Sequence, residues 1–394
     1  MKPNLKKIDI VVKYFIPVVA GIEVNILETY RVLVEQGWDV TVHTSKDVYL
    51  QKNSLPDRDS IQGLNVHRYH FSWYGFFPKI NWDQSGIIAL HNFDIFPHFL
   101  ILLRTLFLKL LGRKKYKLVL TPHGGFNPEW SIFPAWKAFV KRTYTYSVGT
   151  WLINNTVDAV RAVSDWEKSE MIKMGLNREL VHTISNGLED AAFVTDEKLV
   201  SPKIKQKVKS WGKYIFGDAR IYSIKNLETI IEALPYIPSD IKFVNIGMVG
   251  DQNYLVEINK LAASLGVSNR VIFPGVVYGA DKYHLYRHSL AFVHMAKWES
   301  FCNVVHQAIG HGLICLVADN TALPYLVKDG INGFLIETYD YLKLAEKINY
   351  VLDPKNRQVV NTIKKHNLIH GRNNTWKNVA ARMQDLYSKL LFKD

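Results

Sequence analysis

The residues with the clearest capacity for chemistry lie in the stretch Trp298–Glu337. Glu299 ends a strand-like apolar run and is followed by a short loop that leads into an expected helix, Val304–Gly310. Exposed backbone N–H groups at a helix start attract anions, and ligands of parallel α/β sheets bind where strands reach their carboxyl ends. The pattern therefore predicts a phosphate on the amides of Phe301–Val304, with Glu299 beside it accepting sugar hydroxyls.

A second cluster, Gly217–Asn226, carries two cations five positions apart, Arg220 and Lys225, ahead of an expected helix. Two cations around a strand-to-helix turn can clamp a pyrophosphate, since arginine makes a bidentate fork and lysine acts as a point charge. They would also stabilise the charge that builds on a leaving diphosphate. This spacing is common on protein surfaces, so the assignment depends on the Glu299 stretch downstream.

The first half of the chain alternates expected strands with expected helices. Glu23–Gln36 has helical spacing of apolar residues and ends at Gly37. A long apolar helix is expected at Ile95–Leu111. The strands expected in this half are Ile8–Phe15, Trp38–Thr44, Gly86–Leu90, Leu118–Thr121, Ala159–Ser164 and Val181–Ser185. Such alternation predicts a parallel sheet covered on both faces.

The second half begins with a basic, polar stretch, Ser201–Lys213, which we expect to be a linker or the surface next to one. Alternation then restarts and predicts a second βαβ module. Its expected elements are the strands Arg220–Ser223, Phe243–Ile246, Val271–Phe273, Leu290–His294 and Leu313–Val317, and the helices Leu227–Leu234, Tyr254–Leu265 and Val304–Gly310. An amphipathic helix, Thr375–Leu391, closes the chain. We therefore expect domains at residues 1–198 and 199–374, with a terminal helix at 375–394.

The bulk composition excludes several other classes of protein. The chain has 394 residues and 48% hydrophobic composition, enough for two cores. Its formal net charge of +13 favours a polyanionic partner without choosing among nucleotide, nucleic acid and membrane. Its two cysteines, Cys302 and Cys315, lack zinc spacing and indicate a reducing compartment. Asp9 and Lys13 interrupt the first apolar run, which predicts a buried strand, not a signal peptide, and no window predicts a transmembrane helix.

The stretch around Glu299 resembles the donor-site signature of glycosyltransferase family 4. The family pattern is Glu-Ser/Gly-Phe-Gly, a helix, a second Glu eight positions after the first, and then Val-x-x-Gly-x-x-Gly. Here Glu299-Ser300-Phe301 and Val327–Phe334 fit, whereas Cys302 replaces a glycine and Gln307 replaces the second Glu. Arg220 and Lys225 keep the family's spacing. The resemblance implies that Glu299 holds the donor sugar and that Gln307 can still accept from ribose, less strongly than a carboxylate.

Weaker matches lie in the first half. The loop Pro17–Glu23 resembles the family's Gly-Gly-x-Glu loop, with Ala20 replacing the first glycine and Gly21 kept, although an ordinary turn is the alternative. His123, in Thr121–Phe126 after an expected strand, resembles the family's His-Gly loop. Asn186 belongs to a Ser-Asn-Gly-Leu run that resembles the family's segment near its interdomain hinge, or is simply a turn.

The resemblance covers about residues 8–391 and implies a GT-B fold: two Rossmann-like parallel-sheet α/β domains that face each other across a cleft. It implies a retaining hexosyltransferase that uses a UDP- or GDP-sugar and a glycan or lipid-linked acceptor, with no cofactor and no metal. The catalytic residues it assigns are Glu299, His123, Arg220 and Lys225. The donor-binding residues it assigns are Gly21, Asn186, Gly247, Ser300, Phe301, Cys302, Asn303, Val304 and Gln307. We expect such an enzyme to be cytoplasmic.

Three alternatives stay open at this point. A nucleotide-sugar epimerase of the same architecture would also use cations and a carboxylate. Gln307 and Cys302 are consistent with an inactive or binding-only homologue. The charge of +13 fits nucleic-acid binding, although no helix-turn-helix, RNA-binding aromatic signature or zinc site supports it, so no nucleic-acid partner is expected.

The segment after His91 suggests a membrane contact. Between Asp94 and Glu129 the chain has six basic residues and no acidic one, together with a run of leucines and phenylalanines. An apolar helix that ends in the basic cluster Arg113–Lys117 can lie on anionic lipid, at the cytoplasmic face of a membrane. The alternative is a buried Rossmann helix with a solvated basic end. Aromatic residues between Tyr69 and Phe77 and between Trp130 and Tyr146 could extend such a surface or belong to the core.

Overall fold

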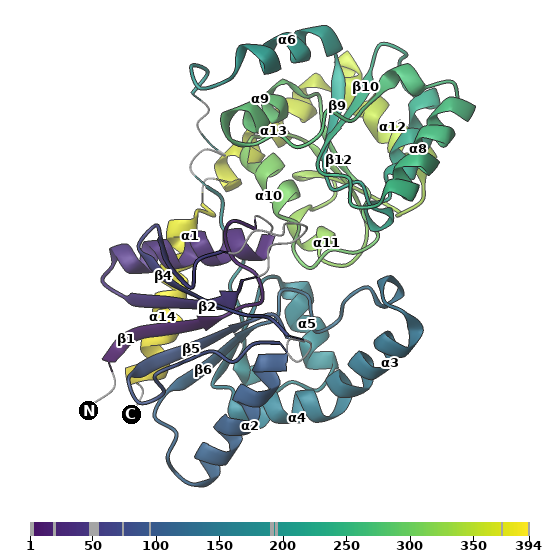
Figure 1. The fold of residues 1–394 in the computed structure, drawn as a ribbon. Coiled ribbons are helices and arrows are strands. Elements are labelled where there is room, and N and C mark those ends of the chain that lie inside the picture. Colours follow the sequence, from purple (N-terminus) through teal and green to yellow (C-terminus); the bar gives the residue numbers. More distant parts are fainter. Residues whose placement is uncertain are drawn as a thin grey trace. The chain divides into compact units, whose positions relative to one another are not determined.

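The computed structural model describes residues 4–18, 21–46, 55–72, 75–93, 96–189, 193, 196–371 and 373–392. The chain divides into two compact units, each with its own sheet and core (Figure 1). The first unit comprises Met1–Gly187 and Trp376–Asp394, and the second comprises Leu188–Thr375. The sequence predicts divisions after residues 198 and 374, whereas the units of the structure divide after Gly187 and after Thr375.

The first unit contains, in its described part, an eight-stranded sheet of order β3-β4-β2-β1-β5-β6-β7-β8. Neighbouring strands are parallel except β3 and β4, which form an antiparallel edge pair. The strands are β1 (Asn4–Val11), β2 (Asp39–Ser45), β3 (Arg58–Ile61), β4 (Leu64–Tyr69), β5 (Ser85–His91), β6 (Lys117–Thr121), β7 (Ala159–Ala162) and β8 (Val181–Thr183). The sequence analysis did not predict β3 and β4. The central strand β5 is buried along its whole length, as expected where helices cover both faces.

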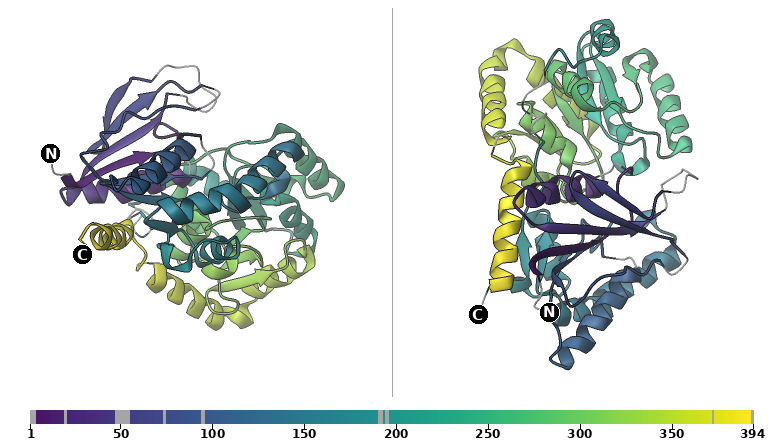
Figure 2. Two further views of the ribbon diagram at one scale, coloured as in Figure 1. Left: turned by 90° about the horizontal axis from the view of Figure 1, so that it is seen from below. Right: turned by 60° about the vertical axis from the view of Figure 1, so that its left-hand side comes forward.

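Helices cover the two faces of this sheet. The helices of the first unit are α1 (Gly21–Glu35), α2 (Phe96–Leu110), α3 (Ala135–Tyr144), α4 (Thr150–Thr156), α5 (Asp165–Lys173) and α14 (Trp376–Phe392). Residues of α1 and α14 share one core cluster, and residues of α2, α4 and α5 contribute to or flank the cluster on the other face. The views in Figure 2 show α14, the yellow C-terminal helix, running along the first unit. Its buried residues include Val379, Met383 and Tyr387, and it packs against α1.

The second unit contains, among its described residues, a six-stranded parallel sheet of order β11-β10-β9-β12-β13-β14. The strands are β9 (Tyr214–Asp218), β10 (Lys242–Ile246), β11 (Val271–Ile272), β12 (Phe292–His294), β13 (Cys315–Ala318) and β14 (Gly333–Ile336). The helices are α6 (Pro202–Trp211), α7 (Leu227–Ala233), α8 (Gln252–Ser264), α9 (Gly279–His288), α10 (Asn303–Gly310), α11 (Leu323–Leu326), α12 (Tyr341–Leu352) and α13 (Arg357–Gly371). The alternation predicts such a parallel α/β unit.

At the start of this unit a helix stands where the sequence predicts a linker or the surface next to one, and one predicted strand is misplaced. The stretch Ser201–Lys213 contains the helix α6, because Ser201 caps its N-terminus, Pro202 occupies its first turn, and Ile204, Val208 and Trp211 form a buried stripe at helical spacing. The strand expected at Arg220–Ser223 lies earlier, at β9. The lysines on the exposed face of α6 concealed that stripe, so the alternation was started one element late.

Two further expectations concern thiols and membranes. Cys302 and Cys315 are both free and both buried. Within the part of the chain that the structure describes, no helix combines the length and the apolar character that crossing a bilayer requires.

Candidate functional site

The carboxylate of Glu299 is held by two side chains of the second unit. Its Oε1 accepts a hydrogen bond from Lys225 Nζ at 2.6 Å and lies 2.8 Å from His294 Nε2. Lys225 ends the short 3-10 turn Ser223–Lys225 that follows β9, and the buried His294 ends β12. Because β9 and β12 are neighbouring parallel strands, their carboxyl ends bring the two groups together.

Backbone contacts also hold the residue in place. The Glu299 N–H donates to Thr321 Oγ1 at 3.0 Å, and the Glu299 carbonyl accepts from the N–H of Ala322 at 3.2 Å. Glu299 is thus tied to the loop after β13 as well as to the turn after β9. These contacts leave the carboxylate little freedom, as a preorganised site requires.

The ionisation of Glu299 gives a pH prediction. Burial would raise the pKa of this carboxyl, but the Lys225 charge and the His294 hydrogen bond outweigh burial and lower the pKa to about 2 from 4.5. Because the folded-state pKa is the lower one, the contribution of Glu299 to stability is present above pH 4.5 and is lost as pH falls toward 2. Denaturant unfolding measured from pH 2 to 7 should show this loss, and Glu299→Gln should flatten it. An equally steep acid limb in Glu299→Gln would contradict the assignment.

The loop that carries Arg220 begins where β9 ends. Arg220 is exposed, and the neighbouring Ile221 forms only an isolated bridge with Val249. Asn226 adopts a left-handed conformation with φ of 51°, and its side-chain amide donates to the carbonyls of Met295 at 2.9 Å and Thr338 at 2.7 Å. Asn226 therefore ties the turn after β9 to the segment that follows β12.

Gly247 follows β10 and lies against this loop. Its φ is +144°, and a Cβ atom at this position would lie 2.2 Å from the carbonyl oxygen of Ala219. Only glycine permits so close an approach between the two backbones. Gly247 thus allows the backbone just ahead of Arg220 to take its place.

The helix start after Glu299 has the geometry of an anion site. The N-cap of α10 is Cys302, with φ of +78°, and its own side chain makes no capping hydrogen bond to the first turn. This left-handed φ explains why the family has glycine here, and a cysteine adopts it at a cost of about 1–2 kcal/mol. Burial raises the pKa of the Cys302 thiol well above its usual range, so the thiol is neutral.

The two residues between Glu299 and Cys302 have different environments. Ser300 is partly exposed, whereas Phe301 is buried and its ring meets His306 edge-on, with ring centroids 5.3 Å apart. The Phe301 side chain therefore anchors the loop to α10. It is the Phe301 backbone that could serve a ligand.

Gln307 lies on α10, about one turn after the first residue of the helix, Asn303. Its side-chain oxygen Oε1 is buried and meets no hydrogen-bond donor among the described residues. An unpaired buried acceptor costs free energy, so native proteins usually pair such a group with protein, water or ligand. The position is the one at which the family has the glutamate that binds ribose.

We predict that Gln307→Glu is tolerated and binds the donor at least as tightly as wild type. A carboxylate accepts a stronger hydrogen bond from a ribose hydroxyl, and its buried charge is costly only while no hydroxyl is present. Donor titration by calorimetry, with unfolding measured in parallel, should show unchanged or tighter binding and a less stable free protein. Gln307→Leu is the control, because it keeps the volume and removes the acceptor. Weaker donor binding by Gln307→Glu would contradict a ribose contact.

The Val327–Phe334 motif determines the backbone path of the turn that precedes β14. Gly330 has φ of +71°, and a Cβ on Gly333 would lie 2.3 Å from the carbonyl oxygen of Cys315 on the neighbouring strand β13. The side chain of Asn332 bridges this turn, because its Oδ1 accepts from the Lys328 N–H at 2.6 Å and its amide donates to the Leu326 carbonyl at 2.9 Å. The motif therefore positions β14 at the edge of the sheet.

The acidic residues whose arrangement could suit a metal ion are paired with cationic side chains in this structure. His294, Glu299 and Cys302 offer ligand atoms within 4.8 Å of one another, yet the Lys225 ammonium already lies against the Glu299 carboxylate. A positive side chain in that place fits an ion-paired carboxylate better than a metal ligand. An Asp-x-Asp spacing, of the kind that holds metals in other transferases, occurs at residues 57–59, where Asp57 pairs with Lys46 and Asp59 with Arg68.

In the first unit, His123 lies in the loop after β6. Its φ is +52°, and its Nε2 lies 2.9 Å from Nδ1 of the buried His91 at the end of β5. The chain of contacts continues from His91 Nε2 to Tyr30 OH at 3.2 Å and from there to Tyr387 OH at 2.7 Å. Burial, followed by the charge of Arg161, lowers the pKa of His123 to about 3, so the imidazole is neutral at physiological pH.

A buried carboxylate holds the same loop. Glu167 accepts from the Gly124 N–H with one oxygen and from the Val163 N–H, at 2.7 Å, with the other. Burial raises the pKa of Glu167 to about 7, even though both backbone donors favour the charged form. Glu167 therefore fixes the backbone next to His123.

Gly21 and Asn186 are the other two residues of the first unit that the resemblance assigns to donor binding. Gly21 is the exposed first residue of α1, while the preceding Val19 and Ala20 lie outside the described residues. The buried Asn186 accepts from the Asn25 side chain at 2.5 Å and lies 3.4 Å from a guanidinium nitrogen of Arg161. At Asn186 the polar side chain thus joins a hydrogen-bonded cluster within this unit.

The sequence analysis missed His294, His91 and Glu167. The first two end buried strands, and the carboxyl ends of parallel strands are where sites form, so that signal was present. Glu167 carried no such signal. Its contact with Gly124 joins residues far apart in the sequence.

Two family models match the chain, one for each half. The model described as Glycosyltransferase Family 4 matches residues 19–191, and the model described as Glycosyl transferases group 1 matches residues 202–366. Together the matches span most of the chain. The chain belongs to the family 4 glycosyltransferases.

The relatives of this glycosyltransferase match either nearly all of the chain or about half of it. It is 23% identical over 414 residues to an uncharacterized glycosyltransferase of Methanocaldococcus jannaschii, with 98% of this chain and 100% of the relative covered. It is 26% identical over 203 residues to the lipopolysaccharide core biosynthesis glycosyltransferase LpsE of Rhizobium meliloti, with 51% and 53% covered. A crystal structure of HepE from Anabaena in complex with UDP has a TM-score of 0.76 and 20% identity, with 97% of this chain and 100% of that chain covered. The transferase has the GT-B fold.

Proposed function

We propose that this transferase moves a sugar, with retention of configuration, from a UDP- or GDP-sugar to a glycan or lipid-linked acceptor. The observation that carries the proposal is the Lys225–Glu299–His294 cluster at the carboxyl ends of β9 and β12. Glu299 is followed by the short loop that leads to Cys302, the N-cap of α10, whose side chain makes no capping hydrogen bond. The Glu299 carboxylate, which can accept from hydroxyl groups, thus lies next to the backbone amides at the start of α10, which can bind phosphate.

Each donor-site residue has a proposed role. Among the described residues, both side-chain contacts to the Glu299 carboxylate use Oε1, which leaves Oε2 to accept from hydroxyls of the donor sugar. Lys225 and Arg220 neutralise the charge that develops on the diphosphate as its bond to the sugar breaks. Gln307 Oε1 accepts from ribose, and the amides from Ser300 to Val304 bind phosphate.

The roles in the first unit rest on family resemblance. His123 would contact the donor sugar as a neutral imidazole, which agrees with its lowered pKa. Gly21 and Asn186 are assigned to donor binding by the same resemblance. His91 and Glu167 would act on the donor only through His123 and its loop.

The acceptor and location are part of the proposal. The relative named for lipopolysaccharide core biosynthesis supports a glycan or lipid-linked acceptor. Such acceptors suggest work at the cytoplasmic face of a membrane. By resemblance, transfer needs no metal, no cofactor and no covalent intermediate on the enzyme.

A donor panel tests the proposal. The protein is incubated with nucleotide sugars, and release of UDP or GDP is measured with and without EDTA. We expect one donor class to be turned over, with EDTA having no effect, and NMR of the product to show the donor's anomeric configuration. The HepE complex with UDP makes UDP-sugars the first donors to try. An inverted product would overturn the retaining assignment, and no turnover of any donor would favour a binding-only homologue.

A further inference from the structure

Helix α3 of the first unit buries none of its ten residues. Trp136 and Phe139 are 70% and 71% exposed, and the adjacent Val140 is exposed as well. Residues three and four positions apart share one face of a helix, so these side chains form an apolar stripe. Large apolar side chains gathered on a surface usually mark a site of protein or membrane contact.

Two further helices of the same unit also carry exposed apolar side chains. On α2, Phe107 and Leu110 are exposed, and on α4 Trp151 is exposed. Helices α2 and α4 pack against each other and cover the same face of the sheet, while α3 leads into α4 through one π-helical turn, Thr145–Gly149. Seen from below, these helices lie toward the viewer (Figure 2, left). We call the exposed surface of α2, α3 and α4 the basic–apolar face.

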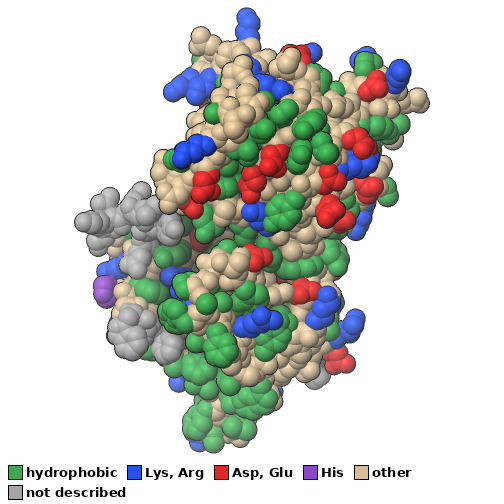
Figure 3. Space-filling model, turned by 90° about the vertical axis from the view of Figure 1, so that its right-hand side faces the viewer, with side chains coloured by type: hydrophobic (Ala, Val, Ile, Leu, Met, Phe, Trp, Pro, Cys, Tyr) green, Lys and Arg blue, Asp and Glu red, His purple; other side chains and the backbone are tan. Residues whose placement is uncertain are grey.

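The charge of this segment is strongly one-sided. Residues 96–157 contain nine Lys or Arg residues and one acidic residue, Glu129. Most of the chain's formal net charge of +13 therefore comes from this short segment. Figure 3 shows Lys and Arg side chains among hydrophobic ones on the lower part of the surface, which belongs to the first unit. A protein-binding surface with this charge would need a strongly acidic partner, whereas anionic lipid supplies both the acid groups and an apolar interior.

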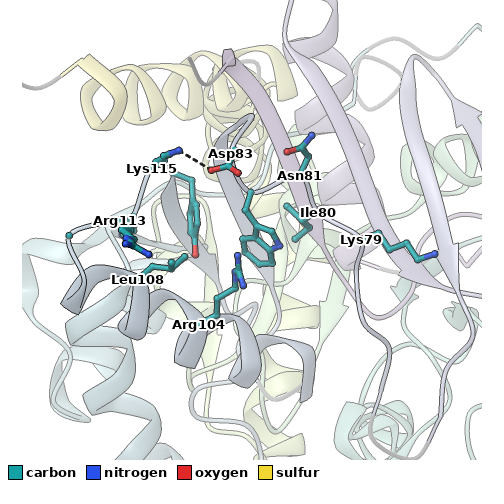
Figure 4. Close-up of a pocket in the computed structure, with 12 residues that line it drawn as sticks. Lys79, Ile80, Asn81, Asp83, Arg104, Leu108, Arg113 and Lys115 are labelled. Atoms are coloured by element: carbon teal, nitrogen blue, oxygen red, sulfur yellow. Dashed lines mark hydrogen bonds and ion pairs between the residues drawn. The ribbon is translucent and has the colours of Figure 1, made fainter. Parts of the chain in front are cut away.

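A pocket of about 760 Å³ opens beside the end of α2 (Figure 4). Its lining includes Lys79, Arg104, Arg113 and Lys115, and the guanidinium of Arg104 lies 4.5 Å from the centroid of the Trp82 ring. Such a pocket next to an apolar helix face has room and charge for the phosphate of a lipid headgroup.

The basic cluster Arg113–Lys117 is engaged in part within the unit. Lys114 pairs with Asp158 at 2.5 Å, and Lys115 pairs with Asp83 at 3.0 Å, the contact drawn as a dashed line in Figure 4. The exposed cations of α3, Lys137 and Arg142, are therefore better placed than this cluster to contact a ligand. Trp136 and Phe139 on the same helix supply the exposed apolar side chains.

We infer that the basic–apolar face docks onto an anionic lipid bilayer, with Trp136 and Phe139 at the headgroup boundary. Tryptophan favours that boundary, because its ring is apolar and its N–H can donate a hydrogen bond, and the neighbouring phenylalanine adds apolar area that lipid can cover. Lys137, Arg142 and Arg113 would contact lipid phosphates. The inference rests on the proposed function only in one step: docking would present a lipid-linked acceptor to the enzyme.

Liposome co-sedimentation tests the inference. The full chain is mixed with vesicles of phosphatidylcholine alone or with added phosphatidylglycerol, at low and high salt. We expect binding that requires phosphatidylglycerol and weakens with salt. The double variant Trp136→Ser/Phe139→Ser should bind at least tenfold more weakly. Its matched control, Tyr278→Ser/Ile369→Ser, removes exposed apolar side chains of the second unit and should bind like wild type.

A charge-matched pair isolates the electrostatic part. Lys137→Gln/Arg142→Gln should weaken binding roughly tenfold or more, since each basic residue near an anionic surface contributes measurably. Lys203→Gln/Lys209→Gln lowers the net charge equally, on the exposed side of α6, and should have little effect. Equal losses in both variants would mean that net charge alone attracts the protein, which would overturn the inference.

Two readouts separate this inference from the proposed function. Nucleotide release from the donor without vesicles should be unchanged in the α3 variants, so loss of lipid binding with normal release supports docking. If wild type turns over a donor but ignores phosphatidylglycerol, the docking inference fails while the proposed function stands. Light scattering is run on the same samples. A dimer that dissociates in Trp136→Ser/Phe139→Ser would identify the face as a contact between copies and overturn the lipid assignment.

Discussion

Replacing Glu299 with alanine is expected to remove nearly all sugar transfer while the protein stays folded. Within the Lys225–Glu299–His294 cluster, only the Glu299 carboxylate can accept hydrogen bonds from several sugar hydroxyls. Lys225 and His294 fix its position before the donor binds. Removing one preorganised electrostatic group from an active site typically costs about 3–4 kcal/mol, or on the order of a thousandfold in rate. Initial rates with the best donor, at saturating and limiting concentrations, measure the loss.

Two companion variants make this result specific. Glu299→Gln keeps the shape and an acceptor oxygen but loses the charge, so it should retain more activity than alanine and less than wild type. Glu257→Ala removes an exposed carboxylate of α8 in the same unit and should be neutral. Unfolding must be followed too, because Lys225 loses a partly buried partner in Glu299→Ala. Normal transfer by Glu299→Ala would show that the signature has been assigned to the wrong chemistry.

Arg220→Ala and Lys225→Ala are each expected to slow transfer by roughly 2–4 kcal/mol of transition-state stabilisation. Both cations lie in the loop and turn after β9, and their charge would be most valuable when the diphosphate leaves. Lys260→Ala, which removes an exposed cation of α8, is the control. Near-wild-type turnover in both Arg220→Ala and Lys225→Ala would contradict the proposal that these two cations bind the leaving diphosphate.

The two variants should differ in a second property. Arg220 is exposed, so its loss should leave stability unchanged. Lys225 also lowers the pKa of Glu299, so Lys225→Ala should raise that pKa and destabilise the second unit. The double variant Lys225→Ala/Glu299→Ala should therefore be much less damaging than the sum of its single variants, because the two residues share one contact. Additive losses would mean that the ion pair has no role in the site.

The local pattern was a good guide wherever one short segment carried the whole signal. Glu299 and the helix after it could be predicted because a strand, a loop and a helix follow one another there. The requirement for a left-handed residue at Cys302 was implicit in the family's glycine. The helix α6 was missed because its four lysines outnumber the three residues that form its buried stripe.

The sequence by itself determined the alternation of strands and helices, the Glu299 signature and the spacing of Arg220 and Lys225, since each is a property of neighbouring residues. Tertiary structure alone decided that His294 and Lys225 share one carboxylate oxygen, and that Glu167 holds the loop of His123. It also decided that α3 stays exposed while α2 is half buried, because burial depends on which elements pack together. Side chains from separate strands meet only when the sheet order is set, and hydrogen bonds over such sequence distances leave no periodic trace in the chain.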